Sequence, residues 1–386
     1  MDNFVCYNPT KVVFGKGTIK ELATLTPKGK ILLIYGGGSI KKNGVYTQVM
    51  ETLKGSEVFE FSGIEANPHY ETCMRCVKYI KEKGITFLLA VGGGSVIDAT
   101  KFIASAVYFE GANPWDILEK RGRNITKAMP FASVLTLPAT GSEMDRAAVI
   151  TKWVTKEKRD MSSDLCYPVF SILDPETTYT LPQRQITNGI VDSFTHVMEQ
   201  YLTYPVRNQI ADRFAESILI SLIEEADNVA SNPHDYDTRA NLMWCATLAL
   251  NGLIACGVPQ DWSTHMIGHE LTALHGLDHG VTLSIVLPGT MNVMRDEKGD
   301  KILQYGQRVF GITEGTREER ITKAINKTQE FFHKIGSPIY LSEVGLDQSC
   351  IAPIVKRMKD RGWALGERGT ITPDKVKAIL TDRLGK

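Results

Sequence analysis

Residues 87–101 read Phe-Leu-Leu-Ala-Val-Gly-Gly-Gly-Ser-Val-Ile-Asp-Ala-Thr-Lys, and this stretch decides the fold. An apolar run ends at three glycines and a serine, and a helical pattern follows. This order predicts a buried strand, a tight glycine turn and a helix. The same order occurs earlier in the chain, where the apolar residues 31–35 precede Gly36-Gly-Gly-Ser39 and a helical pattern over 44–54.

Strand and helix patterns alternate through the rest of the first half. Residues 57–61 predict a strand and residues 70–83 a helix, and further apolar strands are expected at 131–136 and 169–173. Alternation of this kind predicts an α/β fold, with a Rossmann-like, mainly parallel sheet that carries helices on both faces.

The two Gly-Gly-Gly-Ser turns suit the pyrophosphate of a dinucleotide. Each places free backbone N–H groups at the positive end of a helix, and glycine allows a phosphate to approach closely. Neither turn is the G-x-G-x-x-G fingerprint, since Lys41 and Ile97 stand where the third glycine would be. One copy alone would favour an ordinary strand-to-helix turn, but two copies after apolar strands favour the nucleotide.

A third strand, at 131–136, runs into Leu-Pro-Ala-Thr-Gly-Ser-Glu at 137–143. Because the loop follows a strand, its polar residues are candidates for contact with the nicotinamide half of a dinucleotide: Thr136, Thr140, Gly141 and Ser142. The alternative interpretation is a plain loop with a helix cap.

Long amphipathic patterns dominate from Gln183 onward, and strand signals nearly vanish. Examples are residues 211–226, 237–256, 320–335 and 373–384. These patterns predict an α-helical second half. Since 386 residues exceed one ordinary core of roughly 100–200 residues, we expect a dinucleotide-binding α/β domain at 1–181 and an α-helical domain at 182–386.

Composition narrows the class of protein. The 44 basic and 44 acidic residues cancel, which argues against nucleic acid or an anionic membrane as the main partner. No apolar run approaches the ~20 residues of a membrane span, and the N-terminus lacks the features of a signal peptide.

Seven cysteines, an odd number, argue against a disulfide framework, so we expect a cytoplasmic protein. Cys73 and Cys76 fall in a helical pattern and are expected to share a helix face rather than form a zinc or redox pair.

Histidines cluster in two stretches. Asp192 and His196 are four residues apart in a helical pattern, and four of the eight histidines lie in the run His265, His269, His275 and His279. Imidazole and carboxylate are the usual ligands of zinc and ferrous iron, so the two stretches predict a mononuclear metal site. Spacing favours His265 with His269 as ligands but cannot decide among the four histidines.

Two other kinds of metal site are disfavoured by the spacing. The zincin motif H-E-x-x-H, started at His269, would require histidine at Ala273, so a metalloprotease does not fit. The paired Glu-x-x-His motifs of a ferritin-like di-metal centre are not found in the sequence.

In chain order, these motifs resemble the iron-containing (group III) alcohol dehydrogenases. The resemblance rests on the two Gly-Gly-Gly-Ser turns, Asp174-Pro175, Asp192-x-x-x-His196 and the histidine run at 265–279, and it covers nearly the whole chain. Residues 135–143 and 258–279 are most similar to the branch of NADPH-dependent aldehyde reductases and butanol dehydrogenases.

The resemblance implies a dehydroquinate synthase-like architecture with one Fe²⁺ or Zn²⁺ between the two domains. The implied metal ligands are Asp192, His196, His265 and His279. His269 then becomes a catalytic residue near the nicotinamide, and His275 a second candidate for catalysis or support. Spacing cannot distinguish iron from zinc, because this ligand set suits both.

The resemblance also implies a set of cofactor-binding residues. Those near the pyrophosphate and nicotinamide are Gly93, Gly94, Ser95, Asp98, Asn67, Thr136, Thr140, Ser142 and Lys158. In the first turn, NAD-preferring relatives often carry an aspartate where this chain has Gly38 and Ser39. We therefore expect NADP(H) rather than NAD(H), with Ser39, Lys41 and Lys42 at the 2′-phosphate and with Gly37 and Gly38 among the cofactor-binding residues.

The expected reaction is hydride transfer between NADPH and short- to medium-chain aldehydes, for example butanal to butanol. The metal would polarise the carbonyl oxygen, and a relay through the cofactor ribose, water and His269 would supply the proton. The resemblance further implies a homodimer. Rival interpretations are an NAD- and zinc-using cyclase of the dehydroquinate synthase type and a non-catalytic metal- and nucleotide-binding protein. The cyclase is disfavoured because it needs a basic pocket, whereas Trp262, Met266 and Leu271 flank the histidines.

Overall fold

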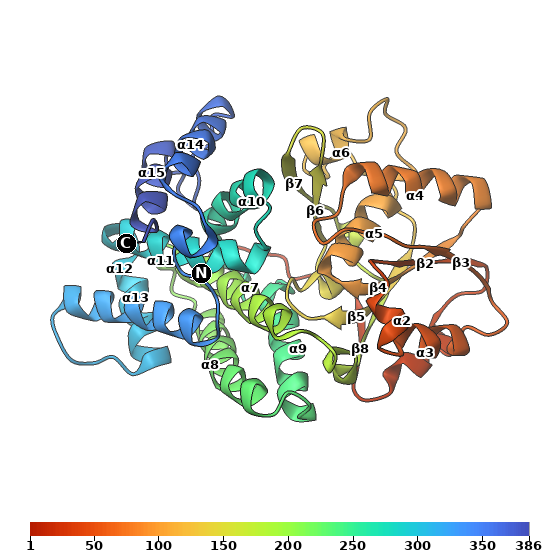
Figure 1. Ribbon diagram of the computed structural model, residues 1–386, viewed down its shortest axis with the longest axis horizontal. Helices are drawn as coiled ribbons and strands as arrows, with labels where there is room; N and C mark the ends of the chain where they lie inside the picture. The colour runs from red at the N-terminus through yellow and green to blue at the C-terminus, as the bar shows by residue number, and fades with distance from the viewer. Residues whose placement is uncertain (386) are drawn as a thin grey trace. The chain divides into compact units, whose positions relative to one another are not determined.

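The structure is a computed structural model that describes residues 1–385. Its internal contacts divide the chain into two compact units (Figure 1). The α/β unit comprises Tyr7–Pro182 and Asn232–Asn251, and the helical unit comprises Met1–Cys6, Gln183–Ser231 and Gly252–Lys386. The expected sequential domains 1–181 and 182–386 stay a prediction.

A six-stranded parallel sheet forms the centre of the α/β unit. The strand order is β1-β8-β5-β4-β2-β3, and every neighbouring pair is parallel. The strands are β1 (Lys11–Phe14), β2 (Lys30–Tyr35), β3 (Glu57–Phe61), β4 (Phe87–Gly93), β5 (Phe131–Leu137) and β8 (Phe170–Leu173). The strands predicted at 31–35, 57–61, 87–91, 131–136 and 169–173 are thus confirmed to within a few residues.

Both faces of this sheet are covered by helices, as Figure 1 shows. Along β2, Ile31 and Leu33 pack in one core cluster with the short helices that surround the first glycine turn. Leu32 and Ile34 point the other way and pack with the opposite set of helices. The helices are α1 (Leu22–Leu25), α2 (Ser39–Lys42) and α3 (Val45–Thr52) on the first face, and α4 (Tyr70–Lys83) and α5 (Gly94–Ala106) on the second. The predicted fold class is confirmed.

Several features of the α/β unit were not predicted, among them the edge strand β1. An antiparallel hairpin of β6 (Ala147–Lys152) and β7 (Glu157–Ser162) packs against α5. The helix α9 (Tyr236–Leu250), from much later in the chain, belongs to this unit, and its Met243 lies in the same core as α4 and α5. Cys73 and Cys76 are buried on one face of α4 in that core, as predicted.

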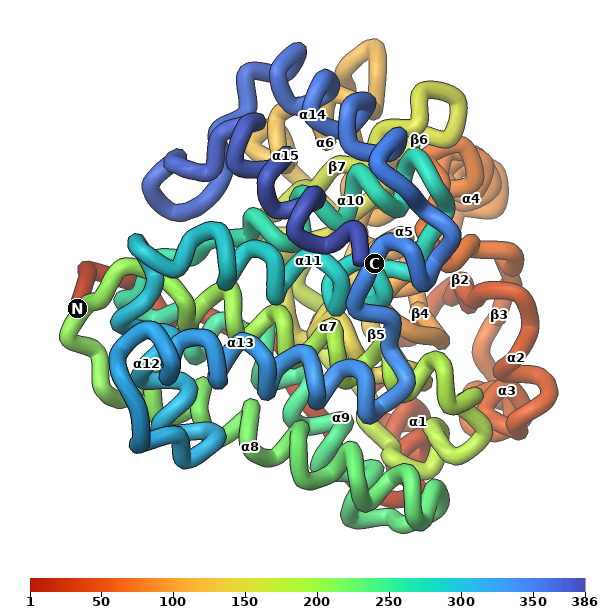
Figure 2. The backbone as a smooth tube through the Cα atoms, turned by 60° about the vertical axis from the view of Figure 1, so that its left-hand side comes forward, coloured from red at the N-terminus to blue at the C-terminus, as the bar shows by residue number. Residues whose placement is uncertain are grey.

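The helical unit is built around α11 (His279–Val293), which contacts α7, α10, α12, α13 and α15 (Figure 2). Residues on every side of α11 are buried, as expected of a helix that is apolar all round. The other helices of the unit are α7 (Gln183–Tyr201), α8 (Gln209–Ser231), α10 (Ser263–His275), α12 (Arg295–Phe310), α13 (Arg317–Lys334), α14 (Ile351–Asp360) and α15 (Pro373–Asp382). Among residues 1–385, none of the helices has both the length and the apolar character that a membrane crossing requires.

Candidate metal centre and nucleotide site

Helix α7 carries the first two residues of the predicted metal site. Asp192 and His196 lie one turn apart on it, and both are buried. Every residue from Gly189 to Tyr201 is buried, so this segment places its polar side chains inside the helical unit. Buried polar groups require partners.

A tight turn brings the histidine run back to α7. Gly276, in the left-handed conformation with φ of 71°, ends α10, and α11 begins at His279. A Cβ atom at Gly268 would lie 2.6 Å from Thr282, and one at Gly280 would lie 2.7 Å from the carbonyl oxygen of Asn188. These two glycines therefore allow α10 to approach α11 closely, and α11 to approach α7 one turn before Asp192.

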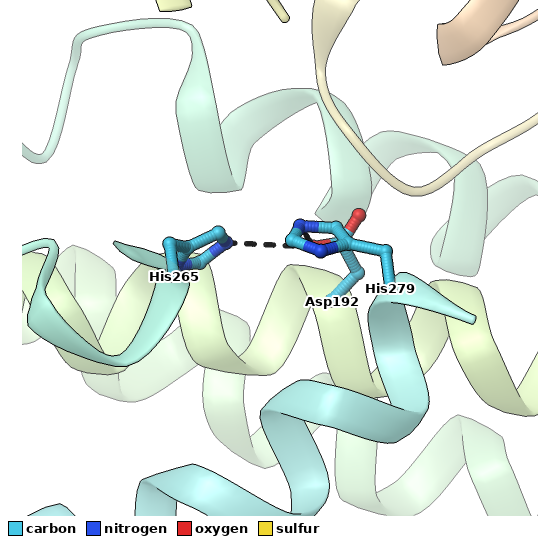
Figure 3. A group of neighbouring side chains, drawn as sticks. All are labelled: Asp192, His265 and His279. Carbon is cyan, nitrogen blue, oxygen red and sulfur yellow. Dashed lines mark ion pairs between the residues drawn. The ribbon is translucent and has the colours of Figure 1, made fainter. Parts of the chain in front are cut away.

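The result is a group of imidazoles around one carboxylate oxygen. Oδ1 of Asp192 lies 3.6 Å from Nε2 of His196, of His265 and of His279. The ligand atoms of Asp192, His265 and His279 all lie within 4.8 Å of one another, and these side chains face each other in Figure 3. The ring of His196 stacks on that of His265, with centroids 4.7 Å apart.

These distances fit a divalent metal ion. Oδ1 of Asp192 and Nε2 of His265 are buried and have no hydrogen-bond partner, and 3.6 Å is too long for a hydrogen bond. Four N and O ligands at about 2.0–2.2 Å from a tetrahedral ion lie about 3.3–3.6 Å from each other. The separations are thus those of ligands that share an ion. The assignment of all four residues as ligands stays a prediction.

Glu199 supports this group, although sequence reasoning missed it. Its Oε2 accepts a hydrogen bond from Nδ1 of His265, and its two oxygens also accept from the backbone N–H groups of Thr264 and His265. The carboxylate therefore fixes the tautomer of His265 and turns Nε2 toward Asp192. The available signal was helical spacing, because Asp192, His196 and Glu199 lie on one face of α7.

Charge in this buried group shifts two pKa values. Burial on its own would raise the pKa of Asp192, but the imidazoles of His196, His279 and His265 outweigh burial and hold the pKa well below its usual range. Burial would lower the pKa of His265, but Glu199 and Asp192 outweigh it and raise the pKa to about 9. The surroundings of Asp192 thus favour its negative charge, which in turn favours a positive charge among the imidazoles.

The two histidines predicted to be catalytic lie in different surroundings. His269 is buried, and its ring centroid is 5.3 Å from that of His279 and 6.4 Å from that of His265. His275 is the last residue of α10 and is exposed. Within residues 1–385, the ring contacts that join the other histidines of this group do not include His275. The structure therefore brings His269, but not His275, to the group. Their roles stay predictions.

In the α/β unit, the two Gly-Gly-Gly-Ser turns follow adjacent strands. From β2 the chain continues to β3 on one side, and from β4 it continues to β5 on the other. Neighbouring strands whose connections run in opposite directions define a topological switch point, where open α/β sheets bind their ligands. The sheet thus places both turns at the expected position for a dinucleotide.

Several predicted cofactor residues meet at the second turn. A Cβ atom at Gly94 would lie 2.2 Å from Oγ1 of Thr140, so this close approach requires glycine. The hydroxyl of Ser142 donates to Oδ1 of Asp98 at 2.6 Å, and the backbone N–H of Val149 donates to Oδ2 of Asp98. The remaining contacts join Ser95 to the carbonyl of Ala66 and Lys158 to Asn67, while Thr136 is buried on β5 and Gly93 packs against Leu137.

The first turn is more open. Gly38 is in the left-handed conformation with φ of 95°, and nothing lies within 4 Å of a Cβ atom built on Gly37 or Gly38. Lys41 lies close by in α2, with its ammonium group 3.3 Å from the Glu60 carboxylate and 4.6 Å from the centre of the Tyr46 ring. A side-chain hydrogen bond with Tyr35 and the charge of Glu60 raise the pKa of Lys41 to about 12. The turn therefore offers exposed backbone beside a permanently charged lysine.

Fold and site together define a class: a doubly wound, nucleotide-binding α/β unit joined to a helical unit with an aspartate–histidine metal site. Within that class, the chain belongs to the iron-containing alcohol dehydrogenase family. Residues 9–175 match the family described as "Iron-containing alcohol dehydrogenase", and residues 186–384 match "Fe-containing alcohol dehydrogenase family, C-terminal". The family predicted from the sequence motifs is confirmed.

Relatives and solved structures agree with this assignment. The chain is 53% identical to the NADPH-dependent aldehyde reductase YqhD of Escherichia coli over 98% of this chain and 99% of that protein. It is 38% identical to NADH-dependent butanol dehydrogenase A of Clostridium acetobutylicum over 96% and 97%. The crystal structure of Escherichia coli YqhD superposes with a TM-score of 0.98, 52% identity and 99% coverage of both chains. A butanol dehydrogenase structure from Thermotoga maritima gives a TM-score of 0.95 at 38% identity, covering 100% of this chain and 99% of that one.

Proposed function

We propose that this protein is a metal-dependent aldehyde reductase that uses NADPH to reduce short- and medium-chain aldehydes such as butanal. The observation that carries the proposal is the group in which Asp192 faces three imidazoles at 3.6 Å. A relative that is 53% identical over nearly the whole chain is an NADPH-dependent aldehyde reductase, and more distant relatives are butanol dehydrogenases.

We assign separate roles in metal binding, ligand orientation and proton transfer to residues of the site. We assign Asp192, His196, His265 and His279 to the Fe²⁺ or Zn²⁺ ion, which when bound supplies a Lewis acid for the carbonyl oxygen. Glu199 orients His265. His269, buried beside His279, is assigned to the proton that the product alcohol gains, as part of a relay with the cofactor ribose and water.

The preference for NADPH rests on the first glycine turn. Residues Gly37, Gly38 and Ser39 present no carboxylate that would repel a 2′-phosphate, and Lys41 lies in the helix that follows. The Glu60 carboxylate already faces Lys41 and accepts hydrogen bonds from Tyr35 and Tyr46. We assign the pyrophosphate to Gly93, Gly94 and Ser95, and the rest of the nucleotide to Asn67, Asp98, Thr136, Thr140, Ser142 and Lys158.

We also infer a homodimer in the cytoplasm. The edge strands β1 and β3 each leave one side of the sheet without a neighbouring strand within residues 1–385, and such edges are common sites of strand pairing. All seven cysteines are free thiols, which suits a reducing compartment.

The test is oxidation of NADPH on addition of butanal, measured with protein loaded separately with Fe²⁺ and with Zn²⁺. We expect turnover that chelation abolishes and metal restores, and a higher kcat/KM with NADPH than with NADH. A cyclase or a binding protein would leave NADPH unchanged. Full turnover after complete removal of the metal would contradict the proposal.

Two histidine variants separate the proposed roles of the site. His279→Ala should lose bound metal and turnover together. The loss in metal affinity should exceed the ~10–100-fold that results when a hydrogen-bond partner of a ligand is removed. His269→Ala should retain the metal, as measured by elemental analysis, while kcat falls or its pH profile shifts. Equal loss of metal in both variants would show that the two histidines are not divided in this way.

A further inference from the structure

The first six residues form an arm that follows a loop of the helical unit. The backbone N–H of Asp2 donates to the carbonyl oxygen of Gly257 at 3.1 Å. A Cβ atom at Gly257 would lie 2.7 Å from Cγ of Met1 and 3.1 Å from Cδ1 of Phe4. The arm Met1–Cys6 therefore lies directly on the segment around residue 257.

Cys256, in that segment, is held in place from several directions. The side-chain amide of Asn208 donates to the carbonyl oxygen of Cys256 at 2.6 Å, and the N–H of Cys256 donates to the carbonyl of Leu253 at 3.3 Å. The thiol itself lies 3.3 Å from the carbonyl oxygen of Gly252. Because Asn208 is buried at the start of α8, the position of Cys256 is fixed by the core of the unit.

The thiol of Cys6 meets that of Cys256. Together with burial, the neighbouring Cys6 raises the pKa of the Cys256 thiol, and Cys6 is exposed while Cys256 is partly exposed. The other cysteines within residues 1–385 are all buried: Cys73, Cys76, Cys166, Cys245 and Cys350. The pair is therefore both in contact and within reach of a small oxidant from solvent.

We propose that Cys6 and Cys256 form a reversible disulfide when the protein meets hydrogen peroxide, which makes this pair a redox modification site. The arm carries one thiol and the segment beneath it carries the other, and the two have to close to a sulfur–sulfur bond of about 2.05 Å. An exposed thiol pair of this kind is expected to be labile and regulatory rather than a permanent cross-link.

The chemistry balances with peroxide as the oxidant. The thiolate of Cys6 attacks one peroxide oxygen, the O–O bond breaks, and a sulfenic acid forms as the first water leaves. The sulfur of Cys256 then attacks the sulfenic sulfur, the S–S bond forms, and the hydroxyl leaves as a second water. The exposed Cys6 meets the oxidant first, and the less exposed Cys256 takes the second step.

The disulfide would fasten the arm to the segment that leads into the metal-site helix. Five residues after Cys256, Asp261 accepts a hydrogen bond from the N–H of Ser263 at 2.7 Å at the start of α10, and His265 follows one turn later. The cross-link would also close a loop that contains all of the α/β unit and the helices α7 and α8 of the helical unit. Closing so long a loop restricts the unfolded chain and stabilises the native state.

The test uses the full-length protein treated with hydrogen peroxide. We expect loss of two free thiols, a Cys6–Cys256 linked peptide in a non-reduced digest, and a rise in Tm of roughly 2–6 °C that dithiothreitol reverses. Cys6→Ser and Cys256→Ser should each abolish the linked peptide and the rise in Tm. Cys245→Ser, a buried control, should retain both.

Two outcomes would overturn this inference. One is oxidation of Cys6 to a sulfinic acid with no linked peptide. The other is a disulfide that joins Cys6 of two chains, seen as a covalent dimer on a non-reducing gel. Neither outcome bears on the aldehyde reductase proposal, because thiol oxidation is measured without substrate.

Discussion

At the scale of single residues, two buried carboxylates of α7 have different tasks. Asp192 makes no hydrogen bond through Oδ1 and lies 3.6 Å from three imidazoles, so its charge is directed at whatever cation occupies their centre. Glu199 instead bonds to Nδ1 of His265 and to two backbone N–H groups. We therefore expect Asp192 to bind the metal ion and Glu199 to orient His265, so mutations can separate the two roles.

Glu199→Gln is the variant that isolates orientation. It preserves the size of the side chain and one carbonyl oxygen for the backbone donors, but removes the charge that fixes the His265 tautomer. We expect affinity for Zn²⁺ to fall by roughly 10–100-fold, measured by competition with a chromogenic chelator. Glu224→Gln, at an exposed position of α8, is the control. Unchanged affinity in Glu199→Gln would exclude the orienting role.

The limits of sequence reasoning at this scale are visible in His269 and His279. Spacing within one helix favoured His265 with His269, and the family resemblance moved the second position to His279. In the structure, Nε2 of His279 lies 3.6 Å from Oδ1 of Asp192, and its assignment as a ligand stays a prediction. Spacing alone could not place His279, because it lies across the Gly276 turn and tertiary packing sets how far the chain turns back.

At the scale of elements, strands with an apolar run were predictable, and the polar strand β7 was not. The strands β2, β4 and β5 are buried on both faces, so they appear in the sequence as continuous apolar runs. β7 reads Glu-Lys-Arg-Asp-Met-Ser and carries no such signal. Helix α11 was also missed, because a helix that is apolar all round has no amphipathic period.

The second glycine turn gives a prediction about packing. Gly94→Ala would place a Cβ atom 2.2 Å from Thr140, and we expect a loss of about 1–3 kcal/mol in the free energy of unfolding. Gly37→Ala is a matched control, because nothing lies within 4 Å of its Cβ position. Urea denaturation should show a lower midpoint for Gly94→Ala and little change for Gly37→Ala. Equal midpoints would contradict the close contact of α5 with Thr140.

A buried lysine connects three segments of the helical unit. Lys298 in α12 donates to Asp261 at 2.6 Å, to Glu367 at 2.9 Å and to the carbonyl of Leu202 at 2.6 Å. Lys298→Met would leave two buried carboxylates without a counter-charge, so we expect a loss of about 3–5 kcal/mol in unfolding free energy. Lys327→Met, which removes only an exposed pair with Glu330, should cost less than about 1 kcal/mol.

The same lysine predicts a pH dependence. Burial would lower the pKa of Lys298, but Asp261 and Glu367 outweigh burial and raise it above 10.5. A raised lysine pKa contributes stability that is fully present below the unfolded value of 10.5 and is lost as pH rises through the folded value. The difference in stability between the unmodified protein and Lys298→Met should therefore shrink above pH 10.5. A constant difference across that range would contradict the argument.

At the scale of the whole molecule, the chain passes between its two units four times, at residues 6–7, 182–183, 231–232 and 251–252. The change of composition near residue 182 was visible in the sequence. The return of the chain to the α/β unit at α9 was not visible, because a helical pattern does not indicate which elements the helix packs against. The partner is shown by Met243 in the core of the α/β unit and by the hydroxyl of Thr247, which donates to Glu143 at 2.5 Å.

A fragment of residues 1–181 should therefore be incompletely packed. Without α9 it leaves the Glu143 carboxyl and the surface around Met243 uncovered, so we expect strong binding of a hydrophobic dye and a broad thermal transition. A peptide of residues 232–251, added in excess, should reduce dye binding, and the same peptide with Met243→Asp should not. A fragment that melts cooperatively on its own would contradict the structural role of α9.

The discontinuity of the α/β unit also bears on how such proteins can be recombined. A chimera that joins two homologous genes at a single junction near residue 182 would combine the sheet of one parent with the α9 of the other. Met243 and Thr247 would then have to fit a core and a buried glutamate that they did not evolve beside. Productive exchange therefore requires two coordinated junctions around α9, and a library built with both should contain more folded members than one built with the first alone.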